Sequence, residues 1–60
     1  MPPKPQEVYR KLLQEGWMDA GGKGSHKKLR RGKRSVVVPM HRKDLAVGTW
    51  HKIQRDAGWK

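Results

Sequence analysis

The chain contains three histidines, and one of them lies in a setting suited to proton transfer. His26 follows a glycine-rich segment, Gly21–Gly24, where the backbone can come close to a ligand. A histidine titrates near neutral pH, so its imidazole can serve as a general base or a general acid. His41 lies just beyond a predicted strand and could approach the same region. His51 falls in the first turn of a predicted helix, an unfavourable place for a cation, and is expected at the surface.

Metal, thiolate and nucleotide-binding chemistry are not expected. The chain has no cysteine, and its widely spaced histidines have no carboxylate cluster beside them. The segment Gly21–Ser25 resembles a phosphate-binding loop in composition, but it lacks the required spacing and lies between strands. A Ser25–His26 nucleophile and base pair is disfavoured because neighbours on a strand point to opposite faces. We therefore expect no metal and no cofactor.

Positive charge dominates the composition. Fifteen Lys and Arg residues stand against five acidic residues, which gives a formal net charge of +10. From Ala20 to Lys43 there is no acidic residue at all. Such a balance attracts polyanions, of which nucleic acid is the commonest in cells. An anionic membrane surface, an acidic protein partner and a basic surface without a binding role are the alternatives, and we place nucleic acid first.

A histidine among lysines and arginines is sufficient to cleave RNA without a metal. RNA carries its own nucleophile, the 2′-hydroxyl, so a protein has to move its proton and stabilise the charge that develops at the phosphate. His26 is the candidate for that proton transfer. The candidates for holding backbone phosphates are Lys23, Lys27, Lys28, Arg30, Arg31 and Arg34.

Hydrophobic periodicity and turn residues predict the elements that would position these side chains. Pro5 opens a first helix, and Pro39 ends the last strand because it cannot donate to a ladder. Thr49 is expected to cap a second helix, which Gly58 ends. The predicted ranges are about 5–15 for the first helix and about 17–20, 25–30 and 34–38 for the strands, and the second helix is expected to start at Gly48 and Thr49. This order, α-β-β-β-α with a three-stranded antiparallel sheet, predicts an α+β fold.

Length and hydropathy limit the overall organisation. Sixty residues predict one domain, 1–60, in which residues 1–4 form a loose lead. Trp17 and Trp50 are expected in the core and Trp59 over the second helix, so none is assigned to RNA stacking. No segment approaches the roughly 20 apolar residues of a membrane span, and the N-terminus lacks the apolar run of a secretory signal. The expected compartment is the cytoplasm.

Several short motifs occur in an order that resembles a known family. They are Gly16-Trp17, Gly24-Ser25-His26, Val38-Pro39, Lys43-Asp44-Leu45, Gly48-Thr49, Ile53 and Ala57-Gly58. Together they cover nearly the whole chain, which is similar to the HicA family of bacterial and archaeal type II toxins. Many members of that family have a second histidine directly after the first, where this chain has Lys27.

The resemblance implies a fold similar to the double-stranded RNA-binding domain, with two helices on one face of the sheet. It also implies a metal-independent endoribonuclease that cuts mRNA, inhibits translation and is neutralised by a HicB-type antitoxin. By the Gly-Ser-His motif the catalytic role falls on His26, with Gly24 and Ser25 shaping its turn. Because Lys27 replaces a second histidine, the helper is expected to be His41, a nearby lysine such as Lys28, or solvent.

Two other functions remain open from the residues themselves. One is an RNA-binding module of the same fold without chemistry, which would grip phosphates and 2′-hydroxyls. The other is a docking module whose basic face serves only an acidic protein. Replacing His26 separates the first of these from an enzyme, because a pure binder would lose only a little affinity.

Overall fold

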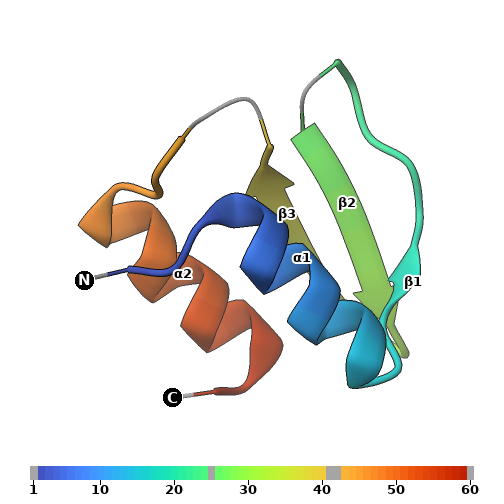
Figure 1. The fold of residues 1–60 in the computed structure, drawn as a ribbon. Helices are drawn as coiled ribbons and strands as arrows, with labels where there is room; N and C mark the ends of the chain where they lie inside the picture. The colour runs from blue at the N-terminus through green and yellow to red at the C-terminus, as the bar shows by residue number, and fades with distance from the viewer. Residues whose placement is uncertain (1, 25, 41–42, 60) are drawn as a thin grey trace.

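The computed structural model describes residues 2–24, 26–40 and 43–59. Within these ranges two helices and three strands follow one another as α-β-β-β-α, and the strands form an antiparallel sheet in the order β1-β2-β3. The elements are α1 (Pro5–Gln14), β1 (Met18–Asp19), β2 (His26–Arg31), β3 (Arg34–Pro39) and α2 (Val47–Ala57). Both helices lie on the same side of the sheet (Figure 1). The predicted α+β fold class is confirmed.

Helix α1 begins and ends close to where the sequence predicts. Pro5 occupies the first helical position, and the Lys4 backbone N–H donates to the Glu7 carboxylate at 3.3 Å. Such a bond satisfies a backbone donor at the helix start. Val8 and Leu12, four residues apart, are both buried against the sheet. Their burial fixes which side of α1 faces the core.

Strands β2 and β3 form a hairpin around the two-residue turn Gly32-Lys33. Gly32 has φ +63°, the left-handed conformation that such short loops require. Alternate side chains of each strand point to opposite faces of the sheet. Leu29, Val36 and Val38 point toward the helices and are each 0% exposed. The opposite face of the hairpin has no helix over it (Figure 1).

Helix α2 begins at Val47, so the prediction that Thr49 caps it is wrong. Ala46 has the extended backbone of an N-cap residue, with φ −65° and ψ 149°. Buried Leu45 precedes it, and Trp50 packs against the same core. An apolar pair at these two positions fixes where the chain enters a helix, independently of a capping side chain. Thr49 therefore lies inside the first turn of α2.

The far end of α2 sets its direction relative to the sheet. Gly58, with φ +77°, ends the helix as predicted and lies against the guanidinium of Arg34 at the start of β3. Helix α2 packs on β3. Because the end of α2 meets the start of β3, the two elements run antiparallel.

Residues from both helices and the sheet form one hydrophobic cluster. Its buried members among the described residues are Val8, Leu12, Trp17, Leu29, Val36, Val38, Leu45, Ile53 and Ala57. Trp17 is in the core as predicted, whereas Trp50 is only half-buried at its margin. Trp59 packs on Trp50 with ring centroids 5.9 Å apart, as expected of a residue folded back over α2. No helix in the described ranges has the length and apolarity to cross a bilayer.

Candidate functional site

His26 is the first residue of β2 and pairs with Pro39 at the end of β3. Its side chain is exposed, and by strand alternation it lies on the sheet face that the helices leave open. Buried Leu29 marks the opposite face, because it is three residues further along the same strand. His26 is therefore reachable by a ligand that approaches the open face.

A groove of about 530 Å³ lies between β3 and α2, and His26 contributes to its lining. The open-face residues of β3 form one wall, and one face of α2 forms the other. The lining residues are His26, Ser35, Val37, Pro39, Thr49, Lys52, Ile53 and Asp56. The groove thus combines apolar, hydroxyl, cationic and acidic groups beside an exposed imidazole.

Two of the six predicted phosphate-binding cations share the open face with His26. Lys28 and Arg30 follow it at two-residue intervals on β2, and both are exposed. Register places Val37 beside Lys28 and Ser35 beside Arg30. This part of the sheet is a positively charged surface that continues into the groove.

Three other predicted cations lie toward the helices instead. Lys27 is 3.8 Å from the Asp19 carboxylate, measured from its Nζ. Arg31 donates to the Glu15 carbonyl at 3.1 Å, and its guanidinium lies 5.0 Å from the Trp17 ring centre. Arg34 is the register partner of Arg31 and lies against Gly58. Lys23, the sixth, is an exposed residue of the loop before β2.

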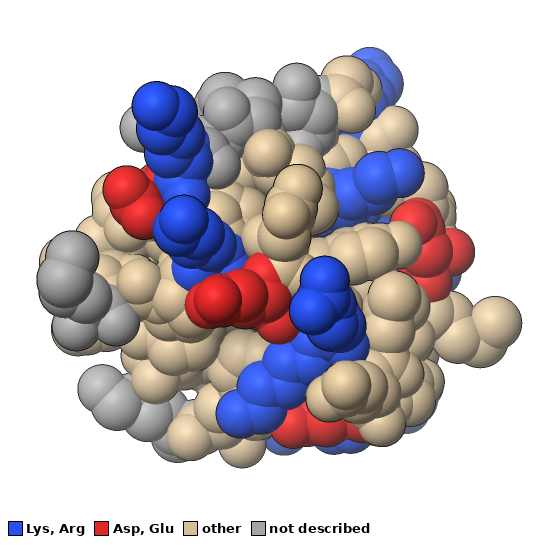
Figure 2. Space-filling model, in the orientation of Figure 1, with Lys and Arg blue, Asp and Glu red and all other residues tan. Residues whose placement is uncertain are grey.

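Acidic and basic side chains alternate on the helix side of the molecule (Figure 2). That mixture contrasts with the open face of β2, where His26, Lys28 and Arg30 are the polar residues. Opposite charges close together largely cancel their field at a distance, whereas like charges add. The open face is therefore the better surface for a polyanion.

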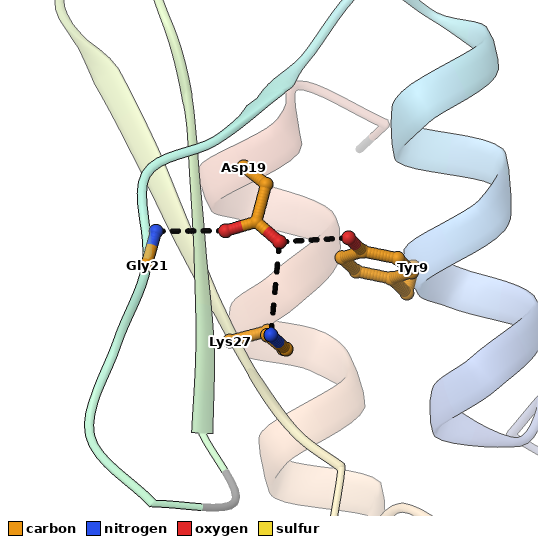
Figure 3. Close-up of polar contacts among 4 residues, drawn as sticks. All are labelled: Tyr9, Asp19, Gly21 and Lys27. Carbon is orange, nitrogen blue, oxygen red and sulfur yellow. Dashed lines mark hydrogen bonds and ion pairs between the residues drawn. The ribbon is translucent and has the colours of Figure 1, made fainter.

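The loop before His26 is held by an aspartate that binds three groups (Figure 3). The Asp19 carboxylate accepts a hydrogen bond from the Gly21 backbone N–H at 2.7 Å and one from the Tyr9 hydroxyl at 2.8 Å. These donors, the backbone N–H first, hold the pKa of Asp19 below its ordinary value, with the charge of Lys27 adding to the effect. The same hydrogen bond raises the pKa of Tyr9. Helix α1 is thereby tied to the start of the loop.

Glycine is required where this loop passes β2. Gly22 has φ +139°, and a Cβ at that position would overlap the backbone carbonyl of His26. Gly24 has φ +57°, and a Cβ there would meet no neighbour, so its turn-shaping role remains a prediction. The His26 backbone N–H also donates to the Lys23 carbonyl at 3.0 Å. Of the glycines in this segment, Gly22 is therefore the one at which a side chain would collide with the backbone of the histidine.

Two predicted site residues, Ser25 and His41, lie outside the described residues. Among those that are described, no group of three or more His, Asp or Glu side chains is arranged to hold a metal ion.

Four polar residues that sequence reasoning did not assign to the site line the groove with His26. They are Ser35, Thr49, Lys52 and Asp56. The last three share one face of α2 at i, i+3 and i+7, a spacing that is visible in the sequence. Their proximity to His26 depends on how α2 packs on β3, which the spacing does not reveal.

The chain was compared with models of known protein families. The model of the family described as HicA toxin of bacterial toxin-antitoxin matches residues 5–59. A search of the curated proteins gave no match to the chain.

Proposed function

The chain belongs to the HicA family of toxins of bacterial toxin–antitoxin systems, and from this membership we propose that it is a metal-independent endoribonuclease that cuts mRNA at His26. The toxin role follows from the family. Its proposed chemistry is cleavage of a phosphodiester bond in RNA, which inhibits translation and places its action in the cytoplasm.

One observation carries the proposal. His26 is exposed on the open face of the sheet, in line with Lys28 and Arg30, and it also lines the groove between β3 and α2. An RNA backbone that lies across Lys28 and Arg30 brings a phosphate to the imidazole. The two cations then position the strand and stabilise negative charge at phosphorus.

In the proposed reaction the RNA supplies its own nucleophile. The 2′-oxygen attacks the adjacent phosphorus, and the bond from phosphorus to the 5′-oxygen of the next nucleotide breaks. One group takes the 2′-hydroxyl proton and another gives a proton to the leaving oxygen, so the products are a 2′,3′-cyclic phosphate and a 5′-hydroxyl. His26 performs one of these transfers. Lys28, two residues along the same face, and His41 are the candidates for the other.

A toxin of this family has an antitoxin partner, and we propose one of the HicB type. The exposed position of His26 and the positive charge beside it support a partner that covers the histidine with acidic groups. Such a partner would block RNA by occupying its surface.

The test compares His26→Ala with His51→Ala. His51 is an exposed histidine of α2 that is not part of the groove lining, so it controls for the loss of an imidazole. We expect His26→Ala to reduce cleavage of purified mRNA by about 10²–10⁴-fold and to abolish growth arrest on induction. His51→Ala should retain both.

Cleavage and growth arrest that survive His26→Ala would contradict the proposal. If the wild-type protein binds mRNA and leaves it intact, the chain is instead a non-catalytic RNA-binding module of the same fold.

A further inference from the structure

We propose that the groove between β3 and α2 is a nucleobase subsite, in which the Asp56 carboxylate selects a base that carries an exocyclic amino group. The inference takes its ligand, single-stranded RNA, from the proposed function. It adds a sequence preference, which the phosphate contacts of Lys28 and Arg30 cannot supply.

The antiparallel packing of α2 on β3 orders the residues along the groove. Pro39 lies at the end of β3 beside His26, and Thr49 lies near the start of α2, so these residues form one end. Ser35 and Asp56 form the other end, because β3 begins where α2 finishes. Along β3, Ser35 and Pro39 are four residue steps apart, which corresponds to about 13 Å. A phosphate at His26 therefore leaves room for a neighbouring nucleoside to reach Asp56.

The groove has the size and lining of a small-ligand site. Its volume of about 530 Å³ falls in the range of pockets that hold small organic ligands. Val37, Pro39 and Ile53 supply apolar surface, on which the flat face of a base can pack. Polar groups that could fix the orientation of a ligand lie at both ends. This arrangement suits a base better than a phosphate.

Asp56 is the feature that makes the groove selective. Its side chain is half-buried in a chain of net charge +10, and among the described residues its carboxylate makes no hydrogen bond or ion pair. A carboxylate repels phosphate and can only accept hydrogen bonds. At this position the carboxylate therefore favours a ligand that brings N–H donors over one that brings phosphate. Lys52, one turn earlier on α2 and exposed, remains available to the backbone phosphate.

The four RNA bases differ in the hydrogen-bond donors that they can offer to a carboxylate. Cytosine, adenine and guanine each present an exocyclic amino group, which an aspartate can accept in a hydrogen bond. Uracil presents carbonyl oxygens on both sides of its single N–H, and these repel a carboxylate. The Ser35 hydroxyl both donates and accepts, so it does not discriminate. Binding, and cleavage next to the bound nucleotide, should therefore disfavour uridine.

The test measures binding of 2′-O-methyl RNA hexamers, which lack the nucleophile and cannot be cut. Fluorescence anisotropy at fixed ionic strength compares hexauridine with the same hexamer containing one cytidine. We expect the cytidine to raise affinity for the wild-type protein by about tenfold, the value of one hydrogen bond to a charged group. In Asp56→Asn this preference should fall to twofold or less, because an amide can also donate to a carbonyl.

The matched control is Asp44→Asn, which changes the net charge equally at an exposed acid that does not line the groove. It should keep the tenfold preference. Equal affinity of the wild-type protein for the two hexamers would overturn the inference, as would a preference that survives in Asp56→Asn.

A second comparison requires no protein variant and covers the case in which Asp56→Asn fails to fold. A hexauridine with one adenosine is compared with one that carries purine riboside, which lacks the 6-amino group and gains no N–H donor in its place. Wild-type protein should bind the adenosine probe about tenfold more tightly, and equal affinity contradicts the inference. Because these probes are not cleaved, loss of the base preference and loss of the proposed catalysis are separate results.

Discussion

The two faces of β2 use the same kinds of residue for different purposes. On the open face, His26, Lys28 and Arg30 are exposed and point away from the helices. On the covered face, Lys27 and Arg31 flank buried Leu29 and contact groups near α1 and β1. The six consecutive residues of β2 thus supply a charged, exposed face and a face that contacts the rest of the fold. Side-chain alternation along the strand is sufficient to separate the two sets.

A run of basic residues in the sequence predicts a larger basic surface than the structure has, because some of these side chains make contacts within the fold. Lys27 is paired with Asp19, and Arg31 donates to a carbonyl and packs over Trp17. These cations help to join α1 to the sheet. We infer that the proposed RNA surface consists of fewer, aligned cations together with the groove. Substitutions on the open face should therefore lower RNA affinity, and substitutions on the covered face should lower stability.

The largest expected effect is the loss of packing on the covered face. Leu29→Ala removes a side chain with 0% exposure from the core on the covered face of the sheet, and should lower the free energy of unfolding by about 2–5 kcal/mol. The total free energy of unfolding of a chain of this size is roughly 3–9 kcal/mol. The matched open-face change, Val37→Ala, should cost below about 1 kcal/mol because Val37 is 47% exposed. Urea denaturation measures both, and equal losses would refute the assignment of faces.

The next effect concerns RNA affinity. The double variant Lys28→Ala, Arg30→Ala should bind a 2′-O-methyl RNA about tenfold or more weakly at physiological salt, because two phosphate contacts are lost. The slope of log affinity against log salt concentration should become shallower by about 1.4, because each phosphate contact to a single strand contributes about 0.7. The variant Lys27→Ala, Arg31→Ala removes the same charge from the covered face. It should keep most of the affinity and the slope but melt at a lower temperature; equal losses of affinity would show that both faces bind RNA.

A smaller effect concerns the Asp19 contact and its pH dependence. Because the folded pKa of Asp19 is lowered from 3.8, its contribution to stability is fully present above that pH and is lost as pH falls through the folded pKa. Tyr9→Phe removes one donor, so it should lower the thermal midpoint by a few degrees at pH 7. Below the folded pKa of Asp19 the difference from wild type should narrow, since the carboxyl is then protonated. A difference that stays constant from pH 7 to pH 2 would mean that Tyr9 acts only through packing.

The smallest effect distinguishes a groove residue from a helix cap. Thr49→Ala would lower the free energy of unfolding by about 1 kcal/mol if Thr49 capped α2. Because the helix begins at Val47, the change should alter the free energy of unfolding by no more than about 0.5 kcal/mol. Thermal denaturation tests this, and a loss near the capping value would restore the sequence-based assignment.

Local patterns in the sequence were sufficient for most of the fold. Pro5 and Gly58 mark helix ends through their own backbone preferences, and Gly32 marks the hairpin turn. Thr49 was wrongly predicted as the N-cap of α2 because capping preferences depend only on residues that are close in sequence. The start of α2 depends instead on buried Leu45, whose role becomes visible only with the packed core.

The candidate site was predictable only in part, because it is assembled by tertiary contacts. His26 could be singled out from its motif and its glycine-rich approach. Asp56 and Lys52 follow it by more than 25 residues and reach the same groove only because α2 runs back along β3. The assignment of Lys27 and Arg31 to RNA binding remains a prediction, and their positions on the covered face weigh against it.

The close passage of Gly22 beside the His26 carbonyl has a genetic consequence. Every missense change of a glycine codon introduces a side chain, and any side chain at residue 22 displaces the backbone that carries the histidine. Cells selected for survival under forced expression of the toxin should therefore include many different alleles at this codon. Since Gly22 is exposed and outside the hydrophobic cluster, those alleles should yield protein that still accumulates, unlike survivors altered in the core.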